Sequence, residues 1–166
     1  MPGTPESALG SDAVTLAATL AGAAFFAAAP YALSATALDP ATFAVAGGVA
    51  YALACLTVWT GARVLTGAFA DMRVKRPLGF VGVSLVATVF LWAEVAIPYY
   101  LYARWAFLAP MAGAFVAAWV TLSMFAHVRG ESDPLGLYPF AFGPVLLGVV
   151  VALSLAEASV RYLVGV

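Results

Sequence analysis

The sequence predicts an all-α protein, a polytopic transmembrane helix bundle with five spans. Of its 166 residues, 64% are hydrophobic and 9% are charged, and the mean hydropathy is +1.02. Soluble domains carry about a quarter charged residues, and a chain of this size cannot hide so much apolar surface from water. Lipid is therefore the expected solvent. The net charge of −1 argues against a nucleic-acid partner.

Five apolar stretches separated by short polar segments define the expected elements. Residues 1–11 are expected to form a disordered N-terminal tail, and residues 12–166 a single five-helix transmembrane domain. No Lys or Arg precedes Arg63, so the first stretch lacks the basic start of a secretory signal and should be retained as a span. The expected helices cover residues 12–38, 40–70, 78–103, 105–128 and 137–164.

The second expected helix opens at Asp39-Pro40, a capping residue followed by a proline that suits the first helical position. Small side chains then recur along it every four residues, at Ala46, Ala50 and Ala54. Small residues at this spacing let membrane helices approach each other closely. We therefore expect this alanine stripe to pack against the first helix or against a partner.

A group of basic residues sets the expected orientation. The loop between the second and third helices holds Arg73, Lys75 and Arg76, and short loops rich in Lys and Arg stay on the cytoplasmic side. This inner basic loop places the N-terminus inside and the C-terminus outside. Arg63, near the end of the second helix, should snorkel to the headgroups of the same side.

The third expected helix carries Glu94, the one acid that falls at hydrocarbon depth. At 1.5 Å per residue from Leu78, Glu94 lies about 24 Å along a hydrocarbon core of roughly 30 Å, which places it in the outer leaflet. Pro98 also removes the amide that would bond the carbonyl oxygen of Glu94. A carboxyl group at this depth is costly unless it is paired, hydrated or protonated.

The last two expected helices run through residues 105–128, which close with His127, and through residues 137–164. The third and fifth helices both run outward in the deduced topology. Charged side chains near their outer ends therefore predict an outer polar cluster, formed by Glu94, Arg104, Glu157 and Arg161. Glu157 and Arg161 have the i, i+4 spacing and acid-first order that favour an ion pair.

Two interpretations of Glu94 remain open at this stage. In one, the carboxylate makes a structural ion pair with Arg161 or Arg104, because opposite charges offset the cost of burial. In the other, it is a candidate proton or ion site, since ionisable residues inside a membrane frequently mark transport pathways.

Several chemistries have no support in the sequence. One histidine and one cysteine cannot supply the ligands of a haem, zinc or iron–sulfur site, so neither a cofactor nor a metal is expected. The sequence motifs of serine hydrolases, zinc proteases and P-loop enzymes do not occur. An enzyme would have to act through Glu94 and hydroxyl groups alone, and is the least favoured class.

The sequence leaves two functional hypotheses for a multi-pass membrane protein. The first is a cofactor-free subunit or scaffold of a larger membrane complex, in contact with the lipid bilayer and with other membrane subunits or further copies of itself. The second is a small transporter or channel for a proton, an ion or an apolar solute, centred on Glu94. The absence of Asn and Gln from the chain argues against a polar organic substrate, which needs several fixed hydrogen-bond partners.

Overall fold

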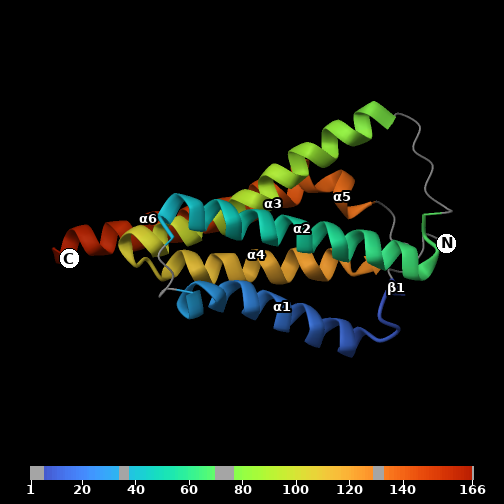
Figure 1. Ribbon diagram of the computed structural model, residues 1–166, viewed down its shortest axis with the longest axis horizontal. Helices are drawn as coiled ribbons and strands as arrows, with labels where there is room; N and C mark the ends of the chain where they lie inside the picture. Colours follow the sequence, from blue (N-terminus) through green and yellow to red (C-terminus); the bar gives the residue numbers. More distant parts are fainter. Residues whose placement is uncertain (1–5, 34–37, 70–76, 129–132, 166) are drawn as a thin grey trace.

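The computed structural model describes residues 6–33, 38–69, 77–128 and 133–165, and confirms an all-α helix bundle (Figure 1). The described elements in chain order are β1 (Glu6–Ser7), α1 (Asp12–Leu33), α2 (Pro40–Thr66), α3 (Pro77–Trp105), α4 (Ala109–Phe125), β2 (His127–Val128), α5 (Pro134–Leu137), the π-helical segment η1 (Tyr138–Phe142) and α6 (Gly143–Val164).

Four helical segments are long and apolar enough to cross a membrane. They are α1, α2, α3 and the 31-residue run of α5, η1 and α6. Helix α4 has 17 residues, which gives a length of about 26 Å, close to the hydrocarbon thickness of a bilayer. By their length and composition, these helices point to a membrane protein. Its orientation in the bilayer stays a prediction from the distribution of basic residues.

Helix α4 lies at the centre of the bundle. Helices α1, α2, α3 and α6 all contact it, and more than half of its residues are buried (Figure 1). Helix α1 packs mainly on α4, whereas α2 packs most extensively on α3. The expectation that the first two helices pack mainly against each other is therefore wrong within this chain. The alternative, that they pack against a partner, stays a prediction.

The alanine stripe does not form the contact between α2 and α3. Ala46 and Ala50 are exposed, and Ala54 is half-buried. The closest approach instead uses Gly48, where an added Cβ would lie 2.7 Å from the backbone oxygen of Trp92. Alanine is small enough for helix contact and apolar enough for lipid, so its spacing alone does not decide which environment it faces.

The N-terminal segment is more ordered than expected. Residues of β1 pair with β2 in antiparallel register, with Glu6 opposite Val128. The amide of Ala8 then donates to the carbonyl oxygen of Ala126, at 3.0 Å. Residues 6–11 therefore attach to the C-terminal end of α4 instead of forming a disordered tail, because their backbone finds partners there. Residues 1–5 lie outside the described part of the chain.

Helix α2 has well-defined ends that follow from its sequence. The Asp39 carboxylate accepts hydrogen bonds from the amides of Ala41 and Thr42, at 3.0 and 3.1 Å. Hydrogen bonds, led by that of the Thr42 side chain, lower the pKa of Asp39. The helix ends at Gly67, whose φ of 67° is a left-handed conformation that glycine adopts without strain. This glycine ends the helix before the expected residue 70.

Helix α4 begins later and ends earlier than the expected range 105–128. A turn precedes it, in which Ala106 has a φ of 54°. The backbone after Phe125 then enters β2 instead of continuing as helix. The last span begins earlier than expected, at Pro134, because Asp133 caps α5 by accepting from the amide of Leu135 at 2.9 Å.

Candidate functional site

Glu94 lies in the interior of the bundle, with no exposed side-chain or backbone surface. The buried residues of α3 run from Ala87 to Tyr99, whereas its first turns are open, and Leu78 is 87% exposed. Glu94 is 11 residues, or about 17 Å, from the end of α3 at Trp105. Glu94 is therefore well inside the bundle, and its outer-leaflet position in the bilayer stays a prediction.

Two tyrosines contact the carboxyl group, and a threonine contacts one of these tyrosines. The Tyr138 hydroxyl donates to Oε1 of Glu94 at 2.6 Å, and the Tyr51 hydroxyl donates to Oε2 at 3.5 Å. Thr121 Oγ1 lies 2.7 Å from the Tyr138 hydroxyl oxygen. All four residues are buried. The resulting chain of hydroxyl groups joins α2, α3, α4 and η1 at one carboxyl group, and we call it the Glu94 site.

The local backbone explains how Tyr138 reaches Glu94. Tyr138 opens the π-helical segment η1, and Pro139 follows it. At Gly143 an added Cβ would lie 2.8 Å from a ring atom of Phe90 and 3.1 Å from the carbonyl oxygen of Tyr138. Glycine therefore permits a close approach between the start of α6 and α3. Single π-helical turns inside α-helices occur frequently at functional sites.

Apolar side chains enclose the Glu94 site. Leu91 and Val95 flank Glu94 on α3 and are fully buried, as are Cys55 and Phe125. Among the residues that the structure describes, the Glu94 carboxyl group makes no ion pair, and no group of three His, Cys, Asp or Glu side chains is placed to hold a metal ion. The hydrogen bonds of the carboxyl group therefore come from neutral hydroxyls.

This arrangement can serve two protonation states of Glu94. A carboxylate accepts hydrogen bonds from both tyrosine hydroxyls. A carboxylic acid still accepts from Tyr138 on Oε1 and can donate its own proton to the Tyr51 oxygen, because a hydroxyl group rotates and also accepts. Each oxygen of the carboxyl group therefore keeps a hydrogen-bond partner in both protonation states.

The outer polar cluster predicted from the sequence is divided in the structure. Arg161 pairs with Glu157 at 2.8 Å and donates to the carbonyl oxygen of Ala106, also at 2.8 Å. Glu157 accepts from the amide of Ala109 at 2.6 Å, at the start of α4. This pair therefore ties α6 to the turn before α4, whereas Glu94 faces the hydroxyls of the bundle interior.

Arg104 is also separate from the Glu94 site. Its guanidinium lies over the ring of Trp105, 5.9 Å from the centroid, at the exposed end of α3. The expectation that Glu94 contacts Arg104 or Arg161 is therefore wrong. The reason is the direction of the Glu94 side chain around α3, which sequence position alone does not give.

Arg63 does not extend toward the headgroups as expected. It is 5% exposed, and its Nη2 lies 3.1 Å from Oδ1 of Asp133. The same oxygen accepts from the indole N–H of Trp59 at 3.0 Å, and the guanidinium lies 4.2 Å from the centroid of that ring. The acid at the start of α5 gives Arg63 a partner inside the bundle. The inner basic loop, with Arg73, Lys75 and Arg76, lies outside the described residues.

Sequence analysis did not single out Tyr51, Thr121 or Tyr138 as partners of Glu94. One signal was available: a chain without Asn or Gln has few groups besides hydroxyls that can bond a buried acid. Which of the many hydroxyls do so depends on the tertiary fold. Comparison of the chain with known protein families, with curated proteins and with solved structures finds no match.

Proposed function

We propose that the protein is a small proton transporter in which Glu94 takes up and releases a proton inside the membrane. The observation that carries this proposal is the full burial of Glu94 among hydroxyl groups, with no ion pair to a cationic side chain among the described residues. Ionisable residues inside membrane spans are costly and frequently belong to proton relays.

The enclosure of the site favours a proton over a larger species. An ion or an organic solute needs space beside the carboxyl group and several further ligands. Tyr138 and Tyr51 already occupy the two carboxyl oxygens. A proton needs no cavity, since it forms an O–H bond on Oε2 and leaves by the reverse step while hydroxyl groups reorient.

Two backbone features support movement at this position. Pro98 supplies no amide to the carbonyl oxygen of Glu94, and η1 replaces regular α-helix at Tyr138. Both features weaken the regular hydrogen-bond pattern next to the acid. The segments that carry Glu94 and Tyr138 can therefore move relative to each other when the proton is exchanged.

A second candidate function is the cofactor-free subunit or scaffold of a larger membrane complex. The hydrogen bonds of the Glu94 site also support this function, because they link four helical segments through the side chains of Glu94, Tyr51, Thr121 and Tyr138. Buried polar groups can specify how helices pair. In this case Glu94 fixes the packing and exchanges no proton.

Proton flux into vesicles separates the two functions. The purified protein is reconstituted into phosphatidylcholine vesicles that contain a pH-sensitive dye, and a potassium diffusion potential drives protons inward. We expect acidification with the wild-type protein and none with Glu94→Gln, whose amide keeps the size of the side chain. Acidification that survives Glu94→Gln, or wild-type vesicles no more permeable than empty ones, contradicts the transport proposal.

A matched pair of tyrosine variants tests the role of the Tyr138 hydroxyl, the hydrogen-bond partner of Glu94. Tyr138→Phe removes the hydroxyl that donates to Glu94, whereas Tyr100→Phe removes one from an exposed position of α3. We expect slower flux with Tyr138→Phe and unchanged flux with Tyr100→Phe. Equal flux in the two variants contradicts a role for the Tyr138 hydroxyl.

A further inference from the structure

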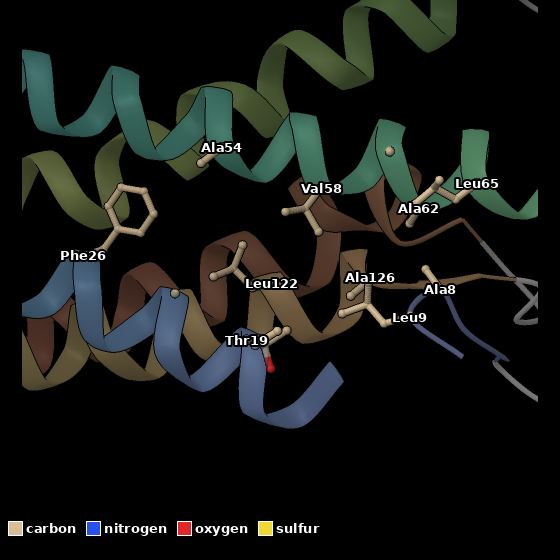
Figure 2. A pocket seen from close by; sticks show the side chains of 13 residues that line it. Ala8, Leu9, Thr19, Phe26, Ala54, Val58, Ala62, Leu65, Leu122 and Ala126 are labelled. Atoms are coloured by element: carbon tan, nitrogen blue, oxygen red, sulfur yellow. The ribbon is translucent and has the colours of Figure 1, made fainter. Parts of the chain in front are cut away.

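A groove of about 350 Å³ runs between α1 and α2 (Figure 2). Leu122 of α4 and Ala126, the residue that follows this helix, form the floor of the groove. Side chains such as Ala18 on α1 and Val58 on α2 form its walls. The groove exists because α1 packs mainly on α4 and α2 on α3, which leaves space between the first two helices.

Protein atoms lie at both ends of the groove. At one end, the Phe26 ring meets the edge of the Tyr51 ring, with 5.1 Å between the centroids. At the other end lie Ala8 and Leu9, held by the hydrogen bond from Ala8 to Ala126 (Figure 2). The remaining opening lies along the side, between two helices that are apolar enough to cross a membrane. An occupant therefore enters from the bilayer.

The lining has one polar side chain, Thr19, and no charged one among the described residues. The Thr19 hydroxyl is already used, because it donates to the carbonyl oxygen of Leu16 and accepts from Ser123, each at 3.1 Å. The groove therefore offers no free hydrogen-bonding side chain to a polar ligand. A free fatty acid would find no cation for its carboxylate in this lining.

The groove is small for a whole transmembrane helix. From Ala54 to Leu65 the wall on α2 is 11 residues, or about 17 Å, long. A helix about 10 Å wide and of that length occupies about 1,300 Å³, more than the total empty space of about 840 Å³ in the groove and its open side. The observed volume is in the range of pockets that bind small ligands. A narrow apolar chain fits this shape.

We infer that the groove binds one acyl chain of a bilayer phospholipid, which enters sideways between α1 and α2 while its headgroup stays at the membrane surface. The surrounding lipid is also apolar, so burial of apolar surface does not favour the groove over the bilayer. Binding depends instead on shape, because the acyl chain makes dispersion contacts with lining atoms that would otherwise have no partner. The bound chain completes the surface between the two helices and holds α1 at its observed distance from α2.

The test is photolabelling by a phosphatidylcholine with a diazirine near the end of one acyl chain, in vesicles of that lipid mixed with unlabelled phosphatidylcholine. Gly61→Leu fills the groove, because an added Cβ at Gly61 meets no atom within 4 Å. Gly148→Leu is the matched control, since Gly148 is equally open and lies on α6. Ala18→Leu fills the groove from the opposite wall and serves as a second variant.

We expect labelled peptides from the groove in the wild-type protein and in Gly148→Leu, and loss of this labelling in Gly61→Leu and Ala18→Leu. Groove labelling that persists in both filled variants overturns the inference. Stronger groove labelling by a diazirine fatty acid than by the phospholipid assigns the groove to free fatty acid and also overturns it. Dissociation of a protein partner upon filling would identify a protein interface instead.

Discussion

The contact between α2 and α3 depends on the absence of a side chain at Gly48. In Gly48→Ala the new methyl group would lie 2.6 Å from Cδ1 of Trp92 and 2.7 Å from the Trp92 carbonyl oxygen. Non-bonded atoms of this kind prefer separations of about 3.5 Å. Rotation of the indole can relieve the first overlap but not the second, because the oxygen belongs to the backbone of α3. The two helices must therefore move apart.

The expected loss of stability follows from two opposing terms. Alanine in a helix interior gains about 0.5–1 kcal/mol over glycine, and overpacking of a tight contact costs about 1–3 kcal/mol. Gly48→Ala should therefore lower the free energy of unfolding by about 1 kcal/mol. At Gly61, on the same helix, an added Cβ meets nothing within 4 Å. Gly61→Ala should therefore raise the free energy of unfolding by about 0.5–1 kcal/mol, with no overpacking term. The two variants should differ by about 1–3 kcal/mol.

The difference can be measured by equilibrium unfolding in mixed micelles, with helicity followed by circular dichroism as the fraction of denaturing detergent rises. Both variants make the same chemical change in α2, so general effects of adding a methyl group cancel. If Gly48→Ala proves as stable as Gly61→Ala, the close approach of α2 and α3 described here is wrong.

Three further predictions follow from other parts of the structure. Asp133→Ala should lower the free energy of unfolding by about 2–3 kcal/mol, because it leaves the charge of Arg63 buried without a partner. This loss is smaller than for a fully buried ion pair, because the Asp133 side chain is 25% exposed. An unchanged melting temperature would argue against this ion pair. The lowered pKa of Asp39 stabilises the fold at pH above the unfolded-state pKa, and this stabilisation is lost as pH falls through the folded-state pKa. Asp39→Asn should therefore reduce the loss of stability on acidification, and an identical pH profile would contradict the capping role. With the N-terminus inside, an impermeant maleimide added to intact cells should label cysteine at Leu38 and not at Ser132; the reverse pattern would invert the topology.

The sequence predicted the fold class and the start of α2 correctly. Both predictions depend on interactions between residues that are close in the chain. Long apolar stretches are expected to be helical in lipid because each backbone group must find a partner within its own segment. Asp39 and Pro40 mark the start of α2 through capping, which involves only neighbouring residues. These signals need no knowledge of which helices touch.

The sequence could not predict which face of each helix points inward. Helices that are apolar on all sides have no polar face to set their rotation, so Ala46 and Ala50 suited lipid and helix contact equally well. Glu94 was singled out from the sequence as an unusual acid in an apolar span, and the structure buries it completely. Its partners could not be predicted, because Tyr51 and Tyr138 reach it from helices 43 and 44 residues away in the chain.

The central claim is that Glu94 gains and loses a proton inside the bundle, and infrared difference spectroscopy tests it directly. Spectra of the reconstituted protein are recorded across a pH titration, and the C=O stretch of protonated carboxylic acids is followed. We expect a band that is absent in Glu94→Gln and shifted in Tyr138→Phe, because the Tyr138 hydroxyl bonds Oε1 of Glu94. Identical difference spectra for the wild-type protein and Glu94→Gln would show that Glu94 exchanges no proton, and would contradict the account.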